Sequence, residues 1–76
     1  MTKLPQLSGK ESIKILLKSG FVHTKKTGSH AILKKQTDKG TVVVPVPLHD
    51  ELAKGTLLSI IYQAGFTREE FIAMKR

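Results

Sequence analysis

Residues 30–46 read HAILKKQTDKGTVVVPV, two apolar-rich runs separated by a polar turn. Residues 41–46 have the β-branched content that is typical of a strand, and residues 30–35 form the other extended run. Between them, Thr37-Asp38-Lys39-Gly40 has the composition of a hairpin turn with glycine last. This stretch therefore predicts an antiparallel hairpin, around which the rest of the chain can be placed.

A further extended run, residues 21–25, precedes the hairpin and is ended by Thr27-Gly28. In the last run, Pro45 and Pro47 lack backbone N–H donors two residues apart, so both missing donors face the same side. Such an arrangement is tolerable only at the edge of a sheet, where the prolines also block pairing with another chain. We expect a three-stranded antiparallel sheet with residues 41–46 at an edge.

Two capping boxes predict helices outside this region. Ser8 and Glu11 have the spacing at which each side chain accepts from the other's backbone amide, and Thr67 and Glu70 repeat it. The first helix would end at Gly20, and its apolar stripe comprises Ile13, Leu16 and Leu17. The last capping box would start a short terminal helix that contains Phe71 and Met74.

A second long helix is predicted from Lys54-Gly55-Thr56 to Gly65, with apolar residues at helical spacing, namely Leu57, Ile60, Ile61 and Ala64. The resulting order is α-β-β-β-α with a small added helix. We therefore expect an α+β fold in which one face of a three-stranded antiparallel sheet is covered by helices.

The composition favours a small basic domain that binds a polyanion or an acidic protein. Residues 1–76 form one predicted domain, with 13 Lys and Arg against 6 Asp and Glu and a formal net charge of +7. There is no cysteine, so neither a disulfide framework nor a thiolate metal site is available. We expect no signal peptide, no membrane span and a cytoplasmic location.

Of the three histidines, His30 is the strongest candidate for chemistry. It follows Gly28-Ser29 at the start of a strand whose Ala31 and Leu33 suit the helix-covered face. By alternation, His30, Ile32 and Lys34 would share the open face. Histidine accepts and donates protons near neutral pH, which suits RNA cleavage.

The other two histidines are weaker candidates. His23 could neighbour His30 across the hairpin, either as a second proton carrier or simply as a cross-strand residue. His49 lies in the loop before the second long helix, where we expect it to be solvated. His30 itself could instead be an ordinary polar strand residue.

The sequence has too few carboxylates without an assigned structural role to predict a metal site. Four of the six have structural roles, Glu11 and Glu70 in capping boxes, Glu69 at a helix start and Asp38 in a turn. Only the adjacent Asp50 and Glu51 are left. A two-metal nuclease needs several converging carboxylates. Nor is there a His-Glu-x-x-His, Walker or G-x-G-x-x-G pattern. We expect neither metal nor cofactor, and any chemistry would be metal-free acid–base catalysis.

Phosphate could be bound at two places. One is the turn before His30 and its strand, and the other is the start of the second long helix, where free amides and the helix dipole favour anions. The candidates for RNA or phosphate binding are Lys25, Lys26, Gly28, Ser29, Lys34, Lys54 and Thr56. For each lysine the alternative is a solvated surface charge.

An ordered set of motifs resembles the HicA-type mRNA interferase toxins of toxin–antitoxin systems. The set consists of Ser8-Gly9-Lys10-Glu11, Gly20-Phe21, Gly28-Ser29-His30, Val44-Pro45-Val46, Lys54-Gly55-Thr56-Leu57 and Gln63-Ala64-Gly65. The resemblance covers about residues 8–71. It implies a double-stranded-RNA-binding-domain-like fold, with His30 at the position of the family's catalytic histidine and Gly28 at that of its preceding glycine.

The resemblance also implies cleavage of mRNA and neutralisation by a HicB-type antitoxin. Because in-line attack needs a flexible nucleotide, we expect unpaired mRNA as the substrate, and the basic charge predicts an acidic contact surface on the antitoxin. Two alternatives to a toxin enzyme are a non-catalytic RNA-binding module of the same fold and an interaction protein that docks an acidic partner. The segment at Lys25, Lys26 and Thr27 departs from relatives that have an arginine before the glycine.

Overall fold

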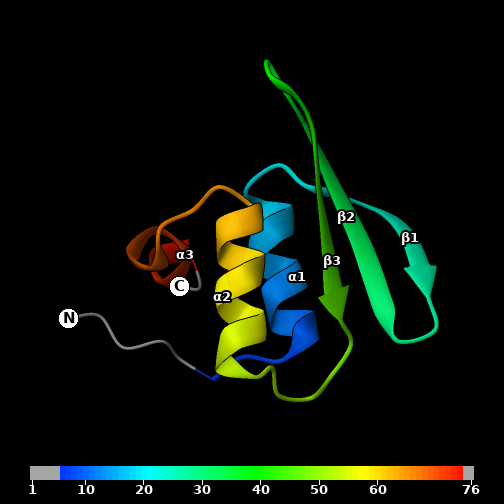
Figure 1. Cartoon of the computed structure of the whole chain (residues 1–76), viewed down its shortest axis with the longest axis vertical. Helices are drawn as coiled ribbons and strands as arrows, with labels where there is room; N and C mark the ends of the chain where they lie inside the picture. The colour runs from blue at the N-terminus through cyan, green and yellow to red at the C-terminus, as the bar shows by residue number, and fades with distance from the viewer. Residues whose placement is uncertain (1–5, 75–76) are drawn as a thin grey trace.

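The computed structural model describes residues 6–74 and confirms the predicted order of elements (Figure 1). In chain order the elements are α1 (Gly9–Lys18), β1 (Val22–Thr27), β2 (His30–Thr37), β3 (Gly40–Pro47), α2 (Lys54–Gln63) and α3 (Arg68–Met74). The chain therefore has the α-β-β-β-α order of a double-stranded-RNA-binding-domain-like α+β fold, followed by a short third helix.

The three strands form one antiparallel sheet in the order β1-β2-β3. The β2–β3 hairpin turns through Asp38 and Lys39, and Gly40 has φ +122°, a backbone conformation that favours glycine. The Thr37 hydroxyl donates to the Gly40 carbonyl (2.8 Å) and so closes the turn. β3, which carries Pro45 and Pro47, is an edge strand as predicted.

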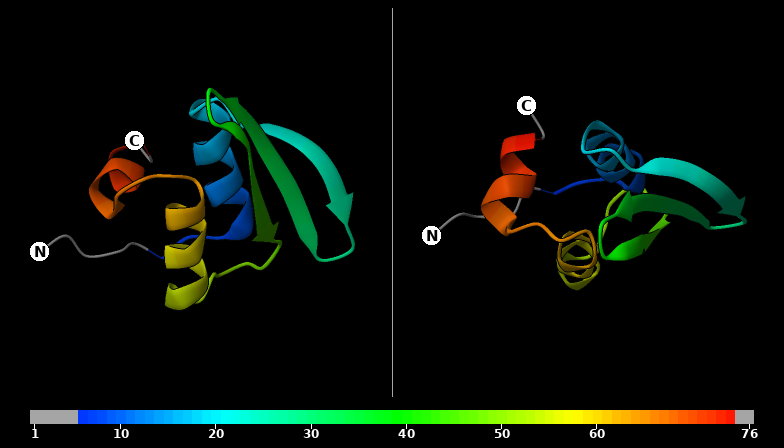
Figure 2. Two further views of the ribbon diagram at one scale, coloured as in Figure 1. Left: turned by 45° about the horizontal axis from the view of Figure 1, so that its top comes forward. Right: turned by 90° about the horizontal axis from the view of Figure 1, so that it is seen from above.

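The helices lie on one side of the sheet, with α1 and α2 against the strands and α3 packed on the two longer helices (Figures 1 and 2). One hydrophobic core fills the space between these layers. Its buried members are Leu7, Ile15, Leu16, Phe21, Ala31, Leu33, Val44, Val46, Leu52, Leu57, Ile60, Ile61 and Phe71. The opposite face of the sheet has no helix over it among residues 6–74.

Local hydrogen bonds fix where the helices begin and end. Both capping boxes are present, with amide-to-side-chain distances of 2.8–3.1 Å at Ser8 and Glu11 and at Thr67 and Glu70. α1 ends in a Schellman motif, because the Phe21 amide donates to the Leu16 carbonyl and Gly20 has φ +101°. α2 ends in the same way at Gly65, whose φ is +84°.

The predicted apolar stripe of α1 is wrong at one position. Leu17 is 45% exposed, whereas Ile15 is buried and Ile13 is half-buried. The cause is the direction from which the sheet and α3 meet the helix: they cover the side that carries Ser12, Ile15 and Leu16. Spacing alone does not choose between neighbouring stripes that both contain leucine and isoleucine. Within residues 6–74, no helix is long and apolar enough to cross a lipid bilayer.

Candidate nucleic-acid interface and active site

His30 is the first residue of β2 and lies on the open face of the sheet. Ala31 and Leu33, which alternate with it, are buried beneath the helices, as predicted. Its backbone pairs with Thr27 on β1 and with Pro47 on β3, and its side chain is exposed. The imidazole is therefore held on a central strand while remaining accessible to a large ligand.

The Ser29 side chain fixes one nitrogen of this imidazole, since Ser29 Oγ lies 3.0 Å from His30 Nδ1. When the serine hydroxyl donates to Nδ1, the ring hydrogen is on Nε2, which can then donate to a ligand. When Nδ1–H donates to Ser29 Oγ, the Nε2 lone pair is free to accept a proton. Because a hydroxyl can rotate, the same contact supports both states of the ring.

The turn before His30 is anchored from the neighbouring loop. The Leu48 amide donates to the Ser29 carbonyl (2.8 Å), which ties the β1–β2 turn to the chain that leaves β3. Gly28, in contrast, has open space around it: a Cβ placed there would have no neighbour within 4 Å. The turn is thus fixed on one side and open to solvent on the other.

The lysines predicted to surround His30 are divided between the two faces of the sheet. Lys25 pairs with Ile32 and so lies on the open face as a diagonal neighbour of His30. The geometry of antiparallel strands puts the Cα atoms of Lys25 and His30 about 7–8 Å apart. Lys26 pairs with the buried Ala31 and belongs to the other face. Lys34 shares the open face, four residues further along β2 from His30, which corresponds to about 13 Å.

The possible pairing of His23 with His30 is wrong, because His23 pairs with Leu33 on the helix-covered face. A register shift between His23 and Lys25 breaks the alternation, and the Thr24 hydroxyl donates to the Ile32 carbonyl there. Leu33, the partner of His23, is three residues from His30 on β2, so the backbones of the two histidines are about 10 Å apart along the strand direction. His49 is exposed in the β3–α2 loop, as predicted.

The start of α2 lies at the same end of the fold as the β1–β2 turn (Figure 1). Its N-cap is Ala53, which makes no side-chain capping hydrogen bond, while Lys54 is exposed and Thr56 is half-buried. The loop before this helix also carries the exposed Asp50 and Glu51. These carboxylates weaken the attraction of this helix start for phosphate.

The open face of the sheet carries positive charge without negative charge. The three strands contain no Asp or Glu, and the two open-face lysines and His30 lie on β1 and β2. In the described part of the chain, no three His, Asp or Glu side chains come together as metal ligands. The face is suited to holding an anionic ligand against an imidazole.

Sequence reasoning missed the polar residues at the far end of this face. Gln36 lies on the same side of β2 as Lys34, and the Thr41 hydroxyl of β3 donates to Gln36 Oε1 (3.0 Å). Alternation along β2 could have assigned Gln36 to the open face. Its pairing with Thr41 depends on the hairpin register.

Comparison with known proteins identifies a family. The family model of the HicA toxin of bacterial toxin–antitoxin systems matches residues 9–66, about three quarters of the chain. The match begins at the first residue of α1 and ends just after α2, so it includes the whole sheet and the Gly28-Ser29-His30 turn. Among curated proteins, no sequence match is found.

Proposed function

The chain belongs to the HicA toxin family of bacterial toxin–antitoxin systems, and we propose that it is a metal-independent endoribonuclease that cleaves unpaired mRNA through His30. The observation that carries this proposal is the accessible imidazole, held by Ser29 on a sheet face without carboxylates. An mRNA substrate would place the activity in the cytoplasm.

The proposed reaction is an in-line transesterification. His30 Nε2 accepts the proton of a ribose 2′-hydroxyl, whose oxygen then attacks the adjacent phosphorus. The bond from phosphorus to the 5′-oxygen breaks, and that oxygen takes a proton from solvent water as it leaves. The hydroxide formed takes the proton held by His30, which returns the imidazole to its starting state. The products are a 2′,3′-cyclic phosphate and a 5′-hydroxyl, so atoms and charges balance without a metal ion.

Positive groups around His30 would stabilise the negatively charged phosphorane. Lys25 supports this role best, because it is a diagonal neighbour on the same face. Lys34 would contact a phosphate further along the RNA, and the exposed Gly28-Ser29 turn leaves room for the backbone to approach. Lys54 and Thr56 would bind phosphate more weakly because Asp50 and Glu51 lie nearby in sequence.

Membership of this family implies an antitoxin partner. We propose a HicB-type protein that uses an acidic surface to cover the open sheet face, including His30, Lys25 and the β1–β2 turn. The charge distribution supports this geometry, because the face is free of carboxylates and would attract an acidic surface. Bound antitoxin would also raise the apparent stability of the toxin by mass action.

The decisive experiment compares His30→Ala with His49→Ala, which removes another exposed imidazole, from the β3–α2 loop. Cleavage of single-stranded RNA is followed with and without EDTA, the new ends are identified, and thermal unfolding is measured in parallel. We expect His30→Ala alone to lower the rate at least a hundredfold with an unchanged melting temperature. Cleavage should survive EDTA and leave cyclic phosphate or its hydrolysis product.

Other outcomes would point elsewhere. Near-normal cleavage by His30→Ala would remove His30 from the mechanism. Activity that is lost in EDTA and restored by magnesium would indicate a metal nuclease. Tight RNA binding by the wild type without any cleavage would support the non-catalytic RNA-binding module instead.

A further inference from the structure

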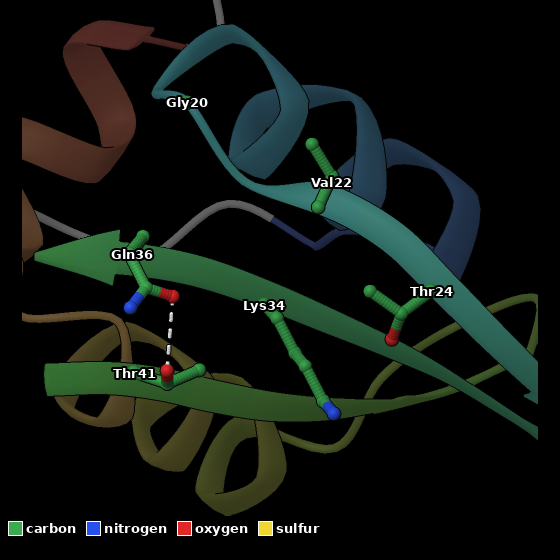
Figure 3. Close-up of a pocket in the computed structure, with 6 residues that line it drawn as sticks. All are labelled: Gly20, Val22, Thr24, Lys34, Gln36 and Thr41. Atoms are coloured by element: carbon green, nitrogen blue, oxygen red, sulfur yellow. Dashed lines mark hydrogen bonds between the residues drawn. The ribbon is translucent and has the colours of Figure 1, made fainter.

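A shallow groove of about 550 Å³ lies on the open sheet face, at the opposite end of β2 from His30 (Figure 3). Its lining comes from three strands and the segment before β1, and comprises Gly20, Val22, Thr24, Lys34, Gln36 and Thr41. The groove exists because β1 begins its pairing at Val22, opposite Lys34. Gln36 therefore has no partner on β1, and Gly20 lines this end of the groove. The volume falls within the range of small-ligand clefts.

The lining of the groove combines one cationic, one apolar and several polar side chains. Lys34 supplies one cation, and none of the lining residues is acidic. Val22, which is 58% exposed, gives an apolar wall on the β1 side, while Gln36 and Thr41 supply polar groups on the other side. A phosphate, an apolar base surface and a base edge could therefore each meet a matching group in one depression.

The hydrogen bond between Thr41 and Gln36 fixes which end of the Gln36 amide can face a ligand. Because the Thr41 hydroxyl donates to Gln36 Oε1 (3.0 Å), the amide oxygen is turned toward β3 (Figure 3). The Gln36 Nε2 group then offers hydrogen-bond donors to a ligand. Such donors match uracil O4 or guanine O6 rather than the amino group that cytosine presents at the position of uracil O4.

The groove and the proposed active site lie on the same face of the sheet. His30, Ile32, Lys34 and Gln36 alternate along one face of β2, and the distance from His30 to Gln36 is about 20 Å by strand geometry. Lys34 stands between the two ends and is paired with Val22 on one side and Val43 on the other. An extended RNA strand whose scissile phosphate is at His30 could follow this row to the groove.

We propose that the groove binds one base of single-stranded RNA several nucleotides from the cleaved bond, and that Gln36 selects a base with a carbonyl oxygen at the position where cytosine has its amino group. The choice of RNA as the ligand rests on the proposed function. The charge of the face favours RNA, because an unpaired strand brings phosphates to Lys34 and exposes base edges to Gln36. This site would add a sequence preference that His30 alone cannot provide.

The test measures binding of wild type, Gln36→Glu, Thr41→Val and Gln63→Glu to short 2′-O-methyl oligouridine and oligocytidine. Methylation blocks the attacking hydroxyl, so binding is observed without cleavage. The two oligonucleotides share backbone and ring size but differ in a carbonyl or an amino group on the base. Gln63→Glu is the matched control, because Gln63 is exposed near the end of α2 and its substitution changes the net charge equally.

We expect the wild type and Gln63→Glu to bind oligouridine about two- to tenfold more tightly than oligocytidine, the range expected for one or two hydrogen bonds. Gln36→Glu should abolish or reverse this ratio, because a carboxylate accepts where the amide donated. Thr41→Val should reduce the ratio toward one, because it frees the amide to rotate.

An equal ratio in Gln36→Glu and Gln63→Glu would overturn the inference. If the Gln36 variant keeps its RNA preference but is no longer neutralised by the antitoxin, the groove is a protein-docking surface and the inference is wrong. Cleavage of unmodified RNA is measured separately with the wild type. Its absence would contradict the proposed function, while the binding ratios would still decide the role of the groove.

Discussion

Replacing Gly9 with alanine should destabilise the protein, although alanine is the better helix former. Gly9 is the buried first residue of α1, and its amide donates to the His49 carbonyl (2.9 Å). A Cβ at this position would overlap the Pro47 carbonyl oxygen and lie 3.2 Å from the Leu48 Cα. These are backbone atoms, so the clash cannot be relieved by rotating a side chain. The start of α1 must therefore move away from the β3–α2 loop.

The size of the effect follows from three contributions. Overpacking of this kind costs about 1–3 kcal/mol. Weakening the Gly9–His49 hydrogen bond costs about 1 kcal/mol more. Alanine recovers about 1 kcal/mol through its helix propensity. The net loss in unfolding free energy is about 2 kcal/mol, which would lower the melting temperature of a domain this small by about 8–16 °C.

The matched control is Gly55→Ala, in the first turn of α2. No atom lies within 4 Å of a Cβ placed at Gly55, so only the gain in propensity remains. We expect this variant to be stabilised by about 0.5–1 kcal/mol. Urea and thermal unfolding followed by circular dichroism measure both variants. A Gly9→Ala protein as stable as wild type, or shifts of equal sign in the two variants, would refute the close packing of α1 against the β3–α2 loop.

Three further results are expected. Ser29→Ala should slow RNA cleavage about two- to tenfold without changing the melting temperature, because it removes the hydroxyl that hydrogen-bonds to the His30 imidazole. Ser29→Thr keeps a hydroxyl and should restore the rate. Equal rates in both variants would rule out this positioning role. Leu33→Ala should lower the free energy of unfolding in urea by about 2–5 kcal/mol, because Leu33 is fully buried on the central strand. Val22→Ala, at an exposed position, should change it by no more than about 0.5 kcal/mol. Similar losses in the two variants would contradict the assignment of the two faces. RNA affinity should fall about tenfold or more between 50 and 200 mM salt if three phosphates are contacted, and a flat salt response in a filter-binding or anisotropy titration would argue against phosphate contacts.

The features that the sequence predicted correctly depend on residues close together in the chain. The capping boxes that start α1 and α3 join residues three apart, and Gly20 and Gly65 end helices through their own backbone conformation. The position of His30 on the open face followed from alternation with Ala31 and Leu33, because the side-chain period of a strand is two. Such interactions form in the same way wherever the segment lies in the fold.

Tertiary structure decided the features that depend on two segments meeting. The shift at Thr24 placed His23 and Lys25 on opposite faces, because an extra residue in one strand reverses the alternation that follows it. The exposure of Leu17 was set by the direction from which the sheet covers α1. The Gln36–Thr41 pair exists only through the hairpin register. The sequence by itself determined the elements and the face of the candidate imidazole, whereas packing and strand register determined which side chains surround it.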